Sequence, residues 1–405
     1  MDFAEVAATI PPASQKAWQD YLTAIDEARA MVMNSAWART PVDRAQGLYY
    51  IQMLQTFGFN IYTAPRQAYP NFYTHSIFLP FELGFGAPAP DFFYHWTFLD
   101  GARTYRIRGR RGNTRWAEMQ AQRGFWGDAD QRRLGNWDFD DFDIGTDGRF
   151  EIVASPTRQD GNWIELDPTA RNITVIVRDA YYDWDKESGL ELHIEALDRT
   201  GDTPLAHSEE EMNRRLTAIG AMTTKAVRFF LDYNDRIAAT VGLNAFYVTP
   251  MNSSDNVGGN PRASYLQMLY DIRPDEALII ETEVPDARYW SIQLADLWWQ
   301  TSDYTYHHSS LNGHQTRIDA DGKARLVLSA VDPGVPNWLD PVDNLTGLAQ
   351  WRWYLTGGMP TPTVRKVPVA DVRNHLPTDT PVVTPEARRA MIVARRQAVL
   401  DRFGF

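Results

Sequence analysis

The chain has 405 residues, of which 44% are hydrophobic and 23% are charged, a balance typical of a globular protein. It contains no cysteine, which excludes disulfides, thiolate metal sites and cysteine nucleophiles. The net charge of −12 opposes contact with phosphate backbones, so we expect no nucleic-acid partner.

Aromatic residues are unusually numerous, with 14 Trp, 18 Tyr and 19 Phe. Aromatic side chains suit half-buried pleated surfaces, so their number favours β-sheet. Most are expected in the core, but such residues also line pockets for sugars and flat apolar molecules.

The N-terminal residues carry neither the basic nor the apolar part of a secretory signal. No apolar run reaches the length that a membrane crossing needs. We therefore expect a cytoplasmic protein with no membrane partner.

Residues 1–65 are predicted to form a helical segment. Apolar residues recur at helical spacing from Trp18 to Ala28. Thr40 followed by Pro41 is typical of a helix start, because threonine caps the first turn and proline suits its first position.

Residues 66–205 are predicted to form an antiparallel β region. Asp-Gly pairs, which suit tight hairpin turns, separate its strand-like runs at 100–101, 147–148 and 160–161. Hairpins are expected in FFYHWTFLDGARTYRIRG and in DFDIGTDGRFEIV. The run ITVIVRDAYYDW is apolar on both faces and is expected to be a central strand.

Residues 206–250 are predicted to contain a long helix and a connection, with Ser208 and Glu211 forming a capping pattern at its start. This helix should join two β regions or pack across one.

Residues 251–380 return to β patterns, after a loop-like composition over 252–264 that suits a lid or binding loop. Residues 381–405 should form a final helix whose five arginines face solvent.

The element order predicts a mainly β, α+β fold. The segments RYWSIQLADLW, DADGKARLVLSAVDPGVPNWLD and PDFFYHWTFLDGARTYRIRGRRG resemble the bacterial family called domain of unknown function 1214, over most of the chain from about 90 to 380. The resemblance implies a jelly-roll-like antiparallel β-sandwich in the C-terminal part. It implies no assigned reaction and no catalytic residues.

The densest group of polar side chains lies in DYTYHHSSLNGHQ, after the Tyr-Trp-Ser strand. A histidine near its ordinary pKa is the usual proton-transfer group, and a carboxylate beside it can orient it and raise its basicity. We therefore predict catalytic roles here for His307, His308, His314, Asp303, Tyr304 and Tyr306. A hydrogen-bonded loop with structural histidines is one alternative, and a divalent metal held by the three histidines is another.

The NWLD bend adds Asp340, which could act as an acid, a base or a partner to a histidine. Residues predicted to wall a pocket or hold the substrate are Trp298, Trp299, Asn337, Trp338, Trp351, Arg352 and His95. Arg352 could bind an anionic substrate group or a buried carboxylate. On a strand it would face away from Trp351 and Trp353. Turn capping and core packing are the simpler interpretations of the others.

The sequence lacks a GxGxxG turn, a Walker loop, a GxSxG elbow and an HExxH helix, so we expect no cofactor. The first hypothesis is an enzyme using acid–base chemistry, a lyase, hydrolase or isomerase, on a small hydroxylated or cyclic organic molecule in an aromatic-lined pocket. It requires residues 303–314 and 337–340 to meet in one tryptophan-lined hollow. The alternatives are a non-catalytic protein that binds carbohydrate or apolar ligands, and a structural protein whose N-terminal helices build a homo-oligomer.

Overall fold

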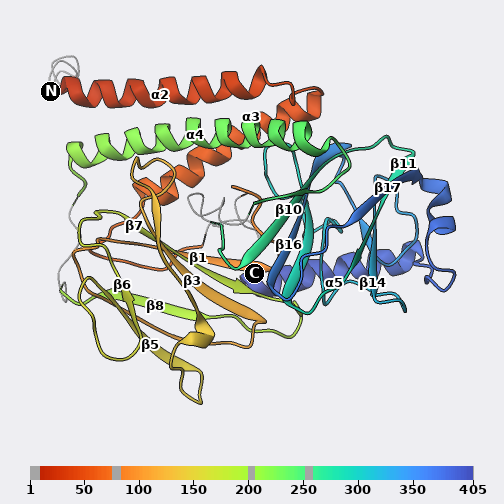
Figure 1. Cartoon of the computed structure of the whole chain (residues 1–405). Coiled ribbons are helices and arrows are strands. Elements are labelled where there is room, and N and C mark those ends of the chain that lie inside the picture. The colour runs from red at the N-terminus through yellow and green to blue at the C-terminus, as the bar shows by residue number, and fades with distance from the viewer. Residues whose placement is uncertain (1–9, 75–83, 199–205, 251–258, 405) are drawn as a thin grey trace.

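The computed structural model describes residues 10–74, 84–198, 206–250 and 259–404. Within these ranges the chain forms two β-sandwiches side by side, with a layer of helices over one side (Figure 1). The predicted mainly β, α+β class is confirmed.

Two helices begin the described chain, α2 (Pro12–Met33) and α3 (Pro41–Gly58), and α3 runs on into the π-helical turn η1 (Phe59–Thr63). Thr40 Oγ1 accepts a hydrogen bond from Asp43 N at 3.1 Å, and Asp43 Oδ2 accepts one from Thr40 N at 2.7 Å. This reciprocal capping satisfies two backbone donors and confirms the helix start predicted at Thr40-Pro41.

The long helix α4 (Glu209–Val241) lies beside α2 and extends over both sandwiches (Figure 1). Ser208 Oγ accepts from Glu211 N at 3.1 Å, so the predicted cap forms. The Glu211 carboxylate instead pairs with Arg214 and Arg215. In the described ranges, no helix combines the length and the apolar character that crossing a membrane would need.

The N-terminal sandwich is built from β1 (Phe92–Leu99), β2 (Tyr105–Arg110), β3 (Trp116–Arg123), β4 (Arg132–Asp138), β5 (Arg149–Ser155), β6 (Trp163–Glu165), β7 (Ile173–Ala180) and β8 (Glu191–Ala196). One sheet has the order β1-β7-β3-β4 and the other β6-β5-β2-β8. Apolar side chains of both sheets, such as Val175 and Ile152, share one core. Strand β7 is central and buried along its length, as predicted.

Both predicted hairpins of this region are wrong. The turn at Asp100-Gly101 joins β1 to β2, but β1 pairs with β7 while β2 pairs with β5 and β8. The turn therefore carries the chain from one sheet of the sandwich to the other. In the second segment only β5 is a strand, and the short 3-10 helix η2 (Phe139–Asp141) precedes it. Periodicity identifies a strand but not the sheet in which it pairs.

The C-terminal sandwich contains β9 (Tyr247–Val248), β10 (Ala263–Asp271), β11 (Glu276–Glu283), β12 (Ala287–Ala295), β13 (Ser310–Asn312), β14 (Lys323–Ser329), β15 (Trp338–Leu339), β16 (Thr346–Thr356) and β17 (Thr363–Pro368). Its sheets have the orders β13-β12-β16-β10-β9 and β15-β14-β11-β17, with a common apolar core. Most of the predicted 252–264 loop lies outside the described residues, and its end at Ala263 already belongs to β10.

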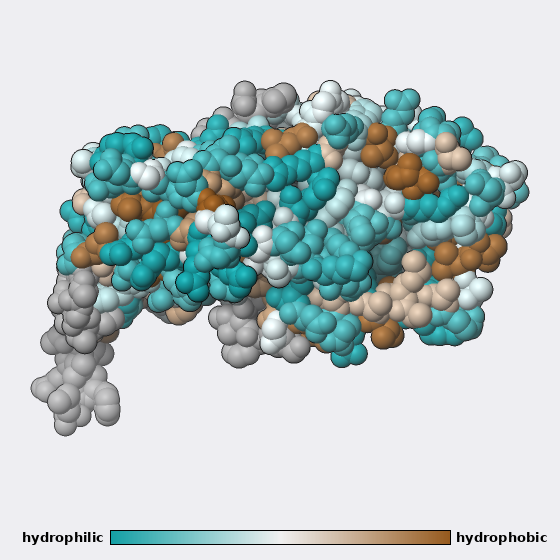
Figure 2. Space-filling model, turned by 90° about the horizontal axis from the view of Figure 1, so that it is seen from below, coloured by the Kyte–Doolittle hydropathy of each residue, from teal (hydrophilic) through white to brown (hydrophobic). Residues whose placement is uncertain are grey.

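The C-terminal helix α5 (Pro385–Phe403) follows the 3-10 helix η3 (Val369–His375) and contacts both sandwiches. Arg389 and Arg396 are exposed, as predicted, but Arg388 and Arg395 are buried. Arg395 donates to Tyr304 O and Ser310 Oγ at 2.5 Å each. The fully solvated helix face is therefore wrong, because two arginines use their length to reach acceptors beneath the helix. From below, the surface is mostly hydrophilic with separate hydrophobic patches (Figure 2).

The carboxylate of Asp91 joins the two sandwiches. Asp91 is 1% exposed and lies just before β1. It accepts hydrogen bonds from Trp184 Nε1 at 2.7 Å in the N-terminal half, and from Tyr289 OH at 2.6 Å and Asn312 Nδ2 at 2.7 Å in the C-terminal half. Burial raises the pKa of Asp91, and the bonds from Tyr289 and Asn312 oppose that rise.

Replacing Asp91 should destabilise the whole protein. Asp91→Ala leaves three buried donors without their acceptor, so we expect the free energy of unfolding to fall by about 3–5 kcal/mol, as measured by urea denaturation. The matched control is Asp160→Ala on an exposed turn, which should change it by less than about 0.5 kcal/mol. Equal effects from the two substitutions would contradict the role given to Asp91.

Candidate functional site

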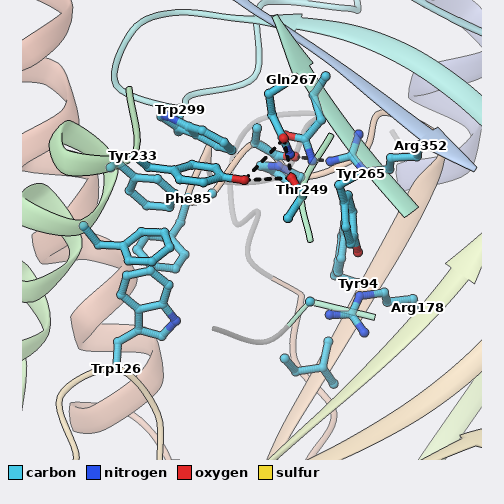
Figure 3. Close-up of a pocket in the computed structure, with 18 of the residues that line it drawn as sticks. Phe85, Tyr94, Trp126, Arg178, Tyr233, Thr249, Tyr265, Gln267, Trp299 and Arg352 are labelled. Carbon is cyan, nitrogen blue, oxygen red and sulfur yellow. Dashed lines mark hydrogen bonds between the residues drawn. The ribbon is translucent and has the colours of Figure 1, made fainter. Parts of the chain in front are cut away.

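A cavity of about 250 Å³ lies where the two sandwiches meet, beneath α4. The sheets that face it are β1-β7-β3-β4 and β13-β12-β16-β10-β9. Its two sides differ in chemistry, with aromatic rings on one and polar or cationic groups on the other (Figure 3).

The aromatic side is a continuous stack of rings. Trp126 stacks on Phe230 with ring centres 5.6 Å apart, and Phe230 stacks on Trp299 at 5.0 Å. Tyr233 lies 5.2 Å from Trp299, and Phe85 contacts the edge of Trp126 at 5.2 Å. Helix α4 supplies Phe230 and Tyr233. Both reach the cavity because residues three apart share one helix face. The rings together form an apolar wall of the cavity.

Trp299 is held in place by a strained turn. Its φ of 62° lies in the left-handed region, which costs a bulky residue about 1–3 kcal/mol. Its carbonyl accepts from Ala87 N at 2.7 Å, and its Nε1 donates to Asn234 Oδ1 of α4 at 2.8 Å. Asp296 closes the turn by accepting from Gln300 N at 3.0 Å. These bonds fix the indole at the cavity.

The polar side follows from strand alternation. Strand β16 turns Gln350, Arg352 and Tyr354 toward the cavity, while Trp351 and Trp353 enter the sandwich core. Strand β10 does the same with Tyr265 and Gln267, which pair across from Arg352 and Gln350. A single sheet thus buries an apolar face and offers a polar one.

Two arginines lie on this polar side (Figure 3). Arg178 forms a buried ion pair with Glu118 of β3. Burial alone lowers the pKa of Arg178, but the Glu118 carboxylate together with the phenols of Tyr265, Tyr354 and Tyr94 raises that pKa above its ordinary value. Arg352 donates to Gln293 Oε1 and to Ala87 O, both neutral acceptors.

A hydroxyl cluster joins the two sides. Tyr233 OH lies 2.7 Å from Thr249 Oγ1 and 3.3 Å from Gln267 Oε1, and Thr249 also bonds Gln267. Burial raises the pKa of Tyr233 to about 12, so its phenol stays neutral and serves as a hydrogen-bond partner.

The structure distributes the predicted tryptophans over several places. Of these, Trp299 lines the cavity. Trp298 donates to Asp43 O at 2.9 Å beneath α3, and Trp351 stacks on Trp290 in the C-terminal core at 5.4 Å. Trp338 donates to Ser329 O at 2.9 Å. Of the other residues predicted to bind substrate, Arg352 lines the cavity, while the Asn337 amide donates to Arg317 O and Arg325 O.

Residues 303–314 and 337–340 do meet, although neither segment is among the described residues that line the cavity. His307 Nδ1 lies 2.8 Å from Asp340 Oδ2, with side chains 39% and 18% exposed. The hydrogen bond that the protonated ring donates to the Asp340 carboxylate raises the pKa of His307. His308 is buried with its Nδ1 2.5 Å from Trp338 O, and burial lowers its pKa to about 3.

The remaining candidates lie apart from this pair. His314 is 3.6 Å from Asp183, and Asp303 caps the backbone of Thr305 and Tyr306. Tyr304 is buried near α5, and Tyr306 is half exposed beneath Arg396. His95 is half-buried in β1, and desolvation of its ring lowers its pKa to about 4. Among the described residues, no three acidic or histidine side chains gather as a metal ligand set.

Sequence reasoning missed most of the cavity. Trp126, Phe230, Tyr265 and Gln350 come from four separate segments without a local motif. The available signals were the aromatic surplus and the polar residues alternating with apolar ones in YLQM and LAQWRWYL. Neither shows which strands face each other.

Comparison with known proteins supports the predicted resemblance. Residues 273–356 match the family model described as protein of unknown function (DUF1214). This segment is therefore similar to the DUF1214 family. It runs from β11 to β16, and therefore includes four of the cavity residues discussed above, Trp299, Gln350, Arg352 and Tyr354. None of the curated proteins matches the chain.

A crystal structure of an uncharacterized protein from Burkholderia cenocepacia is 27% identical, with a TM-score of 0.82 over 88% of this chain and 98% of that one. Its similarity to this chain extends well beyond residues 273–356. A Vibrio parahaemolyticus protein is 12% identical, with a TM-score of 0.46 over 84% of this chain and 100% of that one, which is too low to support an argument.

The two adjacent histidines should titrate very differently. In an NMR titration we expect the pKa of His307 to lie above 6.5 and to fall in Asp340→Asn, while His308 stays neutral down to about pH 3. Because folding raises the pKa of His307, its contribution to stability is complete below the pKa of the unfolded state and is lost as the pH rises through the folded value. A His307 pKa unchanged by Asp340→Asn would refute the assigned cause.

Proposed function

We propose that the protein binds a small cyclic organic molecule in the cavity between the sandwiches. The observation that carries this proposal is the stack of Trp126, Phe230 and Trp299 on one side of a cavity whose other side offers amide, phenol and guanidinium groups. A flat ring would pack on the aromatic stack, and polar groups at its edge would reach β10 and β16.

The lining favours binding over turnover by the protein's own side chains. The described residues that line the cavity include no histidine, aspartate or glutamate. Its tyrosines stay protonated near neutral pH, since burial raises the pKa of Tyr94, Tyr233 and Tyr354. We therefore favour a protein that binds its ligand without converting it.

Two bicyclic probes, 2-naphthoate and 2-naphthamide, test this function by isothermal titration calorimetry. Trp126→Ala and Phe230→Leu should each weaken binding of a probe, by roughly tenfold and fivefold, because each removes a stacking surface. The control is Trp18→Ala, which alters a 53% exposed residue of α2 and should leave affinity unchanged. The proposal fails if neither probe binds, or if both cavity variants bind as the wild type does.

An enzyme using acid–base chemistry, a lyase, hydrolase or isomerase, is the second candidate. The partly exposed His307–Asp340 pair supports it, because a carboxylate-bound imidazole near the surface can exchange protons. Mass spectrometry after incubation with cyclic esters and hydroxy acids would detect a product. We expect His307→Gln to abolish its formation and His193→Gln, on β8, to preserve it; product formation unchanged in His307→Gln would end this candidate.

Three further expectations accompany these proposals: a cytoplasmic location, a jelly-roll connection of the C-terminal sandwich and self-association through the N-terminal helices. The exposed Trp18 and Tyr49 of α2 and α3 support the last of them.

A further inference from the structure

Arg352 is a buried cation without a carboxylate partner among the described residues. Arg352 is 3% exposed. Among the described residues, its guanidinium donates hydrogen bonds only to Gln293 Oε1 and Ala87 O, and it lies 6.0 Å from the centre of the Tyr265 ring. The other buried arginine of the cavity, Arg178, has Glu118. Burying a charge is costly unless it is paired with an opposite charge. A ligand with a negative charge would supply that partner to Arg352.

Gln350 adds an independent sign of a ligand. It precedes Arg352 by two residues on β16 and faces the same cavity. The residue is 4% exposed, yet within the described residues its Oε1 has no hydrogen-bond partner. Nearly all buried polar groups are satisfied, so a buried orphan beside an incompletely paired guanidinium indicates polar groups supplied from outside the protein.

We propose that the ligand is a cyclic carboxylic acid whose carboxylate pairs with Arg352, while its ring lies on the aromatic stack and a donor on its edge meets Gln350. This inference rests on the proposed binding function. A carboxylate suits the site better than a doubly charged phosphate, because one buried guanidinium balances one negative charge. The planar fork of arginine also matches the two carboxylate oxygens.

The test compares two probes of nearly equal shape, 2-naphthoate and its neutral amide 2-naphthamide. Calorimetry with the full chain should give at least about tenfold tighter binding of the carboxylate, the size expected for a buried charge-assisted hydrogen bond. In Arg352→Gln this preference should fall to about one, and in Arg352→Lys it should be smaller than in the wild type but remain. The matched control is Arg228→Gln, which removes an exposed arginine of α4 that does not line the cavity and should keep the preference.

The outcomes separate this inference from the proposed function. Equal affinity for the two probes in the wild type, or a full preference retained in Arg352→Gln, overturns the carboxylate assignment while binding itself stands. Failure of both probes to bind overturns the proposed function. If Arg352→Gln does not fold, as judged by circular dichroism, the wild-type ratio and Arg352→Lys still decide: a ratio near one, or no change in Arg352→Lys, refutes the role of Arg352.

Discussion

A buried carboxylate lies at the contact between the two sandwiches, on which the arrangement of this molecule depends. Asp91 accepts hydrogen bonds from both sandwiches at once, from Trp184 on one side and from Tyr289 and Asn312 on the other. A carboxylate removed from water is stable only if its oxygens are satisfied, so these donors must stay together. Together with the ion pairs of Arg262 and Arg288 with Asp138 and Asp140, these bonds hold one sandwich against the other, and the cavity lies between the two.

The two sides of the cavity have separate structural origins. Helix α4 and the strained turn at Trp299 supply rings, whereas β10 and β16 supply amides, phenols and a guanidinium through the period-two alternation of strands. Such a division gives a ligand an apolar surface and a polar edge without interrupting either apolar core. The segment before β1 helps to bury Arg352, because Ala87 O accepts from it, while Gln293 reaches it from β12 of its own sheet.

Features that depend on local sequence could be predicted. The cap at Thr40, the central position of β7 and the opposite facing of Arg352 and Trp351 each follow from a few neighbouring residues. The sheet in which β1 pairs could not be predicted, since a turn at Asp100-Gly101 is compatible with a hairpin or with a crossing between sheets. The pairing of His307 with Asp340 could be proposed from the sequence. The cavity could not be predicted, because its walls come from segments far apart in the chain.

The contacts of α5 bear on the order in which the chain can fold. Arg402 donates to Pro90 O across 312 positions of sequence, and Asp91 meets Asn312 across 221. During synthesis the N-terminal sandwich emerges from the ribosome long before these partners exist, so the surface around β1 stays uncovered until translation reaches α5. The surface around β1 is therefore covered only late in synthesis, when α5 packs against it.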